Sequence, residues 1–110
     1  MFEGTLWKVT FTSGNDAGCG VISFRDGKVF GGDSGYYYIG SYSLKDAVQF
    51  NATVKVKRHT NNVISIFGNI PEFVLKITGN IINAPISFTG NIENSLLHVV
   101  SGTLTSLENI

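Results

Sequence analysis

A strict alternation of apolar and polar side chains in the middle of this chain constrains its fold more than any other feature. Four apolar residues and four polar residues take alternate positions, in the order Phe50, Asn51, Ala52, Thr53, Val54, Lys55, Val56 and Lys57. Because successive side chains of a strand point to opposite faces of a sheet, this period of two predicts a strand that is buried on one face only.

The same alternation recurs along most of the chain. Between residues 5 and 13, Trp7, Val9 and Phe11 alternate with polar residues. No stretch long enough for a helix carries the apolar spacing of an amphipathic helix cleanly, so the sequence predicts an all-β protein. We expect eight or nine short antiparallel strands, over residues 5–13, 18–25, 28–30, 36–42, 48–58, 63–68, 73–79, 86–92 and 96–104.

Frequent glycines, 13 against two prolines, mark the turns between these strands. Asp26-Gly27 has the composition of a two-residue type I′ hairpin turn, in which both central residues have positive φ. Gly31, Gly32, Asp33, Ser34 and Gly35 follow one another and predict the next reversal of the chain.

The triplet Gly-Asn-Ile occurs three times, at residues 68–70, 79–81 and 90–92. We interpret these triplets as turns or bulges in which a positive φ is needed. The alternative is a row of asparagines that binds a polar molecule.

A flat sheet of this many strands would leave two exposed edges, which invite aggregation. Closure into a barrel removes both edges, and an eight-stranded barrel has an interior that side chains fill or that holds one small ligand. We therefore predict a single domain over residues 1–110, a small antiparallel up-and-down β-barrel of the lipocalin-like kind. A β-sandwich is the competing architecture, but short sequential hairpins favour the barrel because a Greek key usually needs a longer connection.

Composition argues against several classes of partner. Eight basic and eight acidic side chains give a formal net charge of zero, so we expect no nucleic acid partner. No apolar run approaches the ~20 residues of a membrane-spanning helix. Because the first residues also lack the pattern of a secretory signal, we expect a cytoplasmic protein with no membrane partner.

We expect no catalytic, metal or cofactor site. His59, His98 and Cys19 lack the spacing of zinc ligands. The sequence contains no serine nucleophile elbow, and its turn aspartates are explained by bonds to their own backbone. We therefore predict a protein that is not an enzyme.

The tyrosine-rich fourth strand carries aromatic side chains on both faces. Tyr36, Tyr38 and Tyr42 share one face with Gly40, whereas Tyr37 lies on the other. In a closed barrel one set lines the interior and the other covers an outer surface or a subunit contact, where tyrosine is favoured. We hypothesise a homodimer formed through the outer set.

An interior ligand is also consistent with the residues. Arg58 continues the face of Val54 and Val56, so we expect it at a mouth of the barrel, where a guanidinium pairs with a carboxylate or a ligand. In this interpretation a small apolar ligand is surrounded by Trp7, Phe11, Tyr36 or Tyr38, and Arg58.

Several short motifs occur in an order that resembles the GrlR-like family. They are Glu3-Gly4-Thr5-Leu6-Trp7-Lys8-Val9, Gly18-Cys19-Gly20, Asp26-Gly27-Lys28, Gly31-Gly32-Asp33 and Tyr38-Ile39-Gly40-Ser41-Tyr42. The most specific part is Gly31-Gly32-Asp33 followed by an aromatic-x-Gly segment that ends at Gly40. The resemblance covers residues 1–60 well and is loose beyond them.

This family comprises negative regulators of type III secretion in bacteria and their uncharacterised relatives. The resemblance implies a lipocalin-like barrel that dimerises and, in the founding regulator, restrains a transcriptional activator through an acidic surface loop. The corresponding residues here are Ser43, Leu44, Lys45 and Asp46, with a single acid. Such a loop acts by electrostatic complementarity.

The sequence therefore predicts a regulatory protein that binds another protein, with an apolar-ligand barrel as the alternative. A cavity of a few hundred Å³ would favour the ligand, whereas a filled interior with an exposed aromatic patch would favour protein binding.

Overall fold

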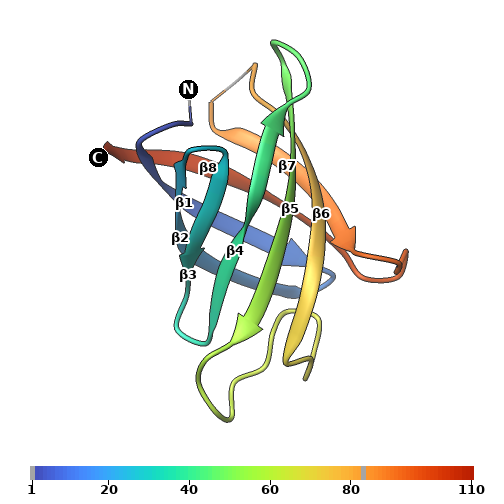
Figure 1. Ribbon diagram of the computed structural model, residues 1–110. Helices are drawn as coiled ribbons and strands as arrows, with labels where there is room; N and C mark the ends of the chain where they lie inside the picture. Colours follow the sequence, from blue (N-terminus) through green and yellow to red (C-terminus); the bar gives the residue numbers. More distant parts are fainter. Residues whose placement is uncertain (1, 83) are drawn as a thin grey trace.

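The computed structural model describes residues 2–82 and 84–110, and its strands form one closed antiparallel barrel (Figure 1). The strands are β1 (Thr5–Ser13), β2 (Asp16–Arg25), β3 (Lys28–Gly32), β4 (Tyr36–Leu44), β5 (Gln49–Arg58), β6 (Glu72–Asn80), β7 (Ile86–Ile92) and β8 (Val99–Asn109). Each strand pairs with the next one, and β8 pairs with β1. The predicted all-β, up-and-down barrel is confirmed. No helix that could cross a membrane occurs in either described range.

The alternation in the sequence becomes the inside and the outside of this barrel. Along β5 every second side chain from Phe50 to Val56 is buried, and the residues between them are at least partly exposed. On β4, Tyr36 and Tyr38 are buried in the interior while Tyr37 points to the outside. The sequence therefore identified the buried face of β5 and the division of the tyrosines between the two faces of β4, and the structure shows that Tyr36 and Tyr38 are on the inner face.

The turn between β2 and β3 has the predicted geometry. Asp26 has a φ of 54° and Gly27 a φ of 76°, the two positive values of a type I′ turn. Arg25 and Lys28 pair on either side of it. A two-residue connection therefore joins these strands, as the Asp-Gly composition predicted.

The strand predicted over residues 63–68 is wrong. Residues 59–71 form a long loop between β5 and β6 with one isolated bridge, between Ser65 and Gly68. The hydroxyl of Ser65 donates to the carbonyl of Gly68 at 2.9 Å, and Gly68 has a φ of 107°, so the chain turns on itself here. Without this strand the barrel has eight strands, and the last of them, β8, starts later than predicted, at Val99.

The glycines of the Gly-Asn-Ile triplets have different roles. Only Gly68 has a positive φ, so the interpretation as turns or bulges is wrong for Gly79 and Gly90, which lie within β6 and β7. A Cβ at Gly79 would overlap the ring of Phe50, and one at Gly90 would lie 2.5 Å from the carbonyl oxygen of Lys76. These two glycines permit close approach inside a sharply curved sheet.

The two ends of the barrel are built differently. The first described residues, the C-terminus, the turns 26–27 and 45–48, and residues 81–82 and 84–85 lie at one end, which we call the closed end (Figure 1). The loops 14–15, 33–35, 59–71 and 93–98 lie at the other, which we call the open end. The functional site depends on this difference.

Candidate functional site

The interior of the barrel is hollow. A cavity of about 420 Å³ occupies the lumen and reaches the open end. Most of its wall consists of side chains that the strands point inward, among them Val9, Ile22, Val29, Val54, Val56, Leu75, Ile77, Phe88, Val100 and Leu104. The volume falls within the range of ~300–1,000 Å³ typical of ligand pockets, and the wall is mostly hydrocarbon.

Aromatic rings form the floor of the cavity at the closed end. Phe24 and Phe50 line the floor, and Phe2 lies against both, with ring centroids 4.4 Å and 5.2 Å away. Trp7 meets Phe2 edge to face at 5.5 Å, and Tyr42 does so at 5.6 Å. Since Phe2 is only 1% exposed, the N-terminal segment plugs this end.

A carboxylate ties that plug to the barrel. Glu3 accepts hydrogen bonds from the backbone N–H groups of Asp26, at 2.6 Å, and Gly27, at 3.2 Å, and from the hydroxyl of Tyr42. The Tyr42 hydrogen bond, followed by the two backbone bonds, lowers the pKa of Glu3. Burial and the bond to Glu3 raise the pKa of Tyr42 to about 12.

The 59–71 loop covers the open end. Residues 63–67 of this loop line the cavity, and Val63 lies against Gly35, where an added Cβ would be only 3.0 Å from the Val63 Cβ. Phe67 meets Phe73 edge to face at 5.3 Å and His98 at 5.9 Å. Side chains of the loop, rather than those of a strand, therefore form the cover of the cavity.

Polar contacts fix the base of this loop to β4 and β5. The hydroxyl of Tyr36 donates to the carbonyl of Ile70 at 3.1 Å and accepts hydrogen bonds from Arg58 at 3.3 Å. Arg58 also donates to the Asn69 amide oxygen at 2.5 Å, and its guanidinium lies 5.8 Å from the Tyr36 ring centroid. Arg58 thus lies at a barrel mouth, where it binds the loop.

Among the described residues that line the cavity, Asp33 is the one with a charged side chain. Its Oδ1 accepts hydrogen bonds from the backbone N–H groups of Gly35 and Tyr36, both at 2.9 Å, and its Oδ2 accepts one from the hydroxyl of Tyr38. Burial, then the bond to Asp33, raises the pKa of Tyr38 well above its ordinary value. The carboxylate is held in one orientation at the open end.

The structure separates the residues that the sequence grouped around a ligand. Phe11, Tyr36 and Tyr38 line the cavity, as proposed. Trp7 lies outside the lining and belongs to the plug, where its indole N–H donates to the hydroxyl of Thr5 at 2.6 Å. Arg58 is near the mouth but outside the lining.

The other candidate residues lie away from the lumen or shape the backbone. Tyr42 belongs to the plug, and Tyr37 lies on the outer surface. Ser43, Leu44, Lys45 and Asp46 are exposed at the closed end, far along the barrel from the cavity mouth. Four glycines lie where an added Cβ would clash with a neighbouring residue, so they permit close approach of the backbone. They are Gly31, Gly32, Gly35 and Gly40.

Sequence reasoning missed the contribution of the 59–71 loop. The sequence predicts a strand over residues 63–68, which contain the apolar residues Val63, Ile64, Ile66 and Phe67. One signal was available: the segment lies between two asparagines and a Gly-Asn pair before Pro71, which favours an irregular connection over a strand.

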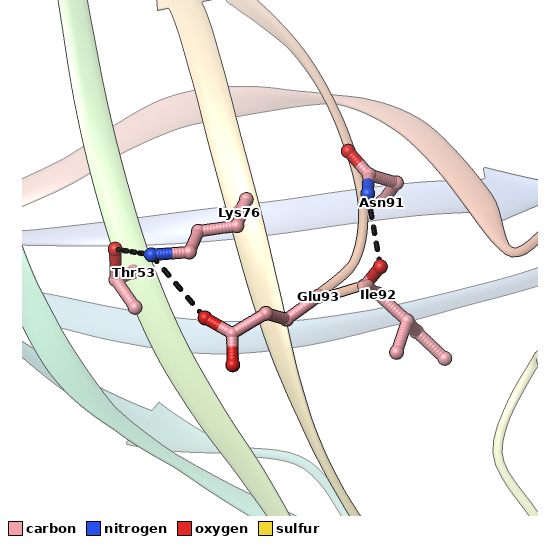
Figure 2. A network of polar contacts seen from close by, with 5 residues as sticks. All are labelled: Thr53, Lys76, Asn91, Ile92 and Glu93. Atoms are coloured by element: carbon pink, nitrogen blue, oxygen red, sulfur yellow. Dashed lines mark hydrogen bonds and ion pairs between the residues drawn. The ribbon is translucent and has the colours of Figure 1, made fainter. Parts of the chain in front are cut away.

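The polar side chains on the outside of the barrel contact one another. Figure 2 shows Lys76, whose ammonium group lies 3.3 Å from the Thr53 hydroxyl and 3.4 Å from Glu93. The amide of Asn91 donates to the carbonyl of Ile92 at 2.9 Å. Because Asn69 and Asn80 lie at opposite ends of the barrel, the triplets form no asparagine row, and that alternative is also wrong.

No group of three or more side chains suited to a metal ion occurs within residues 2–82 and 84–110. Comparison with models of known protein families and with curated proteins gives no match to this sequence. The resemblance to the GrlR-like family therefore stays a prediction from the motifs.

Proposed function

We propose that this protein is a non-enzymatic binding barrel that holds one small, mainly apolar molecule in its lumen. The observation that supports this proposal is the cavity of about 420 Å³ behind the 59–71 loop. A filled interior would have argued for a purely structural core, since protein interiors usually contain few voids larger than a water molecule.

The chemistry of the wall defines the class of ligand. Inward residues such as Val54, Ile77 and Leu104 offer only dispersion contacts and exclude water. Burial of apolar surface contributes roughly 25 cal/mol per Å², so a hydrocarbon body fits the lumen far better than a sugar or a nucleotide. Polar groups gather at the open end, so a polar part of the ligand would lie there.

The test is a fluorescence titration with the neutral apolar dye N-phenyl-1-naphthylamine. Val54→Phe places a ring in the lumen, and Lys55→Phe places the same ring outside on the same strand. We expect saturable binding to the wild type and to Lys55→Phe, and at least about tenfold weaker binding to Val54→Phe.

A milder variant protects this test against misfolding. Overpacking of a core costs roughly 1–3 kcal/mol, so Val54→Leu, which adds less volume at the same position in the wall, is measured beside Val54→Phe. Binding that is not saturable, or that is equal in the inward and outward variants, would show that the dye does not enter the lumen.

A second function is favoured by an apolar patch outside the barrel. We define the outer patch as Val21, Phe30, Tyr37 and Ile39, all exposed on β2, β3 and β4. Phe30 pairs with Ile39, and Gly32, which has no side chain, lies between Val21 and Tyr37. This patch supports a regulatory function that acts by binding a protein, as predicted from the resemblance to the GrlR-like family, and it supports a homodimer.

Sedimentation equilibrium tests the homodimer. We expect a wild-type dimer that Ile39→Lys converts to a monomer, because a charge would be buried in the contact. Thr53→Lys, on the outer side of β5, should leave the dimer intact. A wild-type monomer at all protein and salt concentrations would end the dimer proposal without affecting the cavity.

A further inference from the structure

We infer that the cavity selects apolar molecules with a positively charged end, such as long-chain or aromatic amines, and that Asp33 is their counter-ion. This inference rests on the proposed ligand-binding function. It follows from the place of a single carboxylate in a wall that is otherwise almost entirely apolar.

Asp33 stands apart from the other charged residues. No other Asp or Glu, and no Lys or Arg, belongs to the described lining of the cavity. It lies in the connection between β3 and β4, at the open end, so a ligand would reach its carboxylate with the polar group while its body fills the lumen.

Hydrogen bonds hold the Asp33 carboxylate in place, but none of them comes from a positively charged group. Its three donors, the N–H groups of Gly35 and Tyr36 and the hydroxyl of Tyr38, are all uncharged. An ionised carboxylate has about four acceptor positions, so one position stays available for a donor from the ligand. A fixed, partly desolvated charge of this kind favours a cation over a neutral or anionic group.

No basic side chain of the described residues forms an ion pair with Asp33. The two ion pairs found within residues 2–82 and 84–110 join Lys57 with Glu72 and Lys76 with Glu93. The nearby Arg58 is engaged by Tyr36 and Asn69. His59 contacts the backbone carbonyl of Asp33 through Nε2, at 3.1 Å, rather than its carboxylate.

Aromatic rings around the mouth of the cavity add to the preference for a positively charged group. Phe11, Tyr36, Tyr38 and Phe67 line the cavity together with Asp33. The face of an aromatic ring attracts a cation, most strongly where water is excluded. An ammonium group near Asp33 would therefore be stabilised by both the carboxylate and neighbouring rings.

The experiment compares three competitors that share one chain: decylamine, 1-decanol and decanoate. Each displaces N-phenyl-1-naphthylamine from the protein at neutral pH. We expect decylamine to bind at least about tenfold more tightly than 1-decanol, and decanoate to bind more weakly than either.

Two variants make the same charge change in different places. Asp33→Asn keeps the size of the side chain and an oxygen that accepts backbone hydrogen bonds, and it should bring decylamine and 1-decanol to within about twofold of each other. Asp46→Asn is the matched control, because Asp46 also accepts bonds from two backbone N–H groups, those of Val48 and Gln49, but lies at the closed end. It should leave the preference for decylamine unchanged.

The outcomes are distinguishable. Equal binding of decylamine and 1-decanol to the wild type, which needs no variant to fold, overturns the inference and leaves the binding barrel standing. An Asp33→Asn change that weakens both competitors equally also overturns it, since Asp33 would then only shape the turn. A wild type that binds neither the dye nor any competitor overturns the proposed function as well.

Discussion

The closed end and the open end of this barrel use aromatic residues in opposite ways. At the closed end the ring of Phe2 packs on those of Phe24 and Phe50, and all three side chains are almost completely buried. At the open end Phe67 lies in a loop, half-buried, with its neighbours in the cavity wall. One end is built as a core and the other as a cover.

This difference separates stability from function within one small fold. Fully buried rings at the closed end contribute apolar burial and tight contacts, which stabilise the barrel. The open end gives up part of that stabilisation, because a wall that faces a cavity lacks contacts on one side. Substitutions at the closed end should therefore affect stability more than ligand binding, and substitutions at the open end should affect ligand binding more than stability.

The largest expected effect is on stability at the closed end. Phe2→Ala should lower the free energy of unfolding by roughly 3–5 kcal/mol, as for other large-to-small changes in a core. Phe67→Ala should cost less than about 1.5 kcal/mol because its ring is only half-buried. Urea denaturation measures both values, and equal losses would contradict the division between the two ends.

The next effect is kinetic and concerns the open end. In a Cys19→Ser background, Gly35→Cys and Val63→Cys place two thiols where an added Cβ would lie 3.0 Å from the Val63 Cβ. A disulfide needs about 3.8 Å between these atoms, so a small shift suffices. Oxidation should slow release of the dye at least about tenfold if ligands pass under the 59–71 loop.

Reduction of the same protein provides the control for this crosslink. Release should be at least about tenfold faster when the disulfide is opened, and because the oxidised and reduced forms have the same sequence, this difference is due to the crosslink alone. Equal release rates in the oxidised and reduced forms would mean that ligands enter elsewhere, and the plug at the closed end would be the next segment to test.

A smaller effect is expected where the loop is fastened. Tyr36→Phe removes the hydroxyl that donates to Ile70 and accepts from Arg58, and it should cost about 1 kcal/mol in unfolding free energy. It should also speed release of the dye. Tyr37→Phe changes the adjacent residue on the outer face and should alter neither quantity, so a similar effect of both variants would refute this role of Tyr36.

The smallest effect concerns pH at the closed end. The pKa of Glu3 is lowered from 4.5, so this carboxylate stabilises the fold above that pH, and its contribution is lost as the pH falls through the lowered value. The pKa of Tyr42 is raised from 10.0 to about 12, so its contribution is present below pH 10 and is lost as the pH rises through 12. Glu3→Gln should remove the acid slope in urea midpoints and reduce the alkaline slope, part of which remains because burial also raises the pKa of Tyr42. Unchanged slopes would show that Glu3 does not tie the plug.

The barrel itself could be predicted from the sequence because its signals are local. The alternation from Phe50 to Val56 identifies the inward face of β5. Asp26-Gly27 determines the turn between β2 and β3, because both residues adopt the positive φ that a type I′ turn needs. Closure followed from the number of sequential hairpins. These features depend on neighbouring residues in the chain, which a single sequence displays directly.

The cavity could not be predicted, because its shape depends on contacts between distant residues. Trp7 and Phe11 share one face of β1, yet Trp7 packs in the plug and Phe11 lines the lumen, since the strand runs from one end of the barrel to the other. The apolar residues of the 59–71 loop resemble a strand in composition. Only the fold shows that they cover an opening.

Methyl NMR with N-phenyl-1-naphthylamine tests the central claim, a hollow lumen that holds a ligand, most directly. The account predicts that the dye shifts the methyl signals of inward residues such as Val54, Ile77 and Leu104, with saturation at one dye per chain. Shifts confined to Val21 and Ile39 in the outer patch, or no shifts at all, would contradict it.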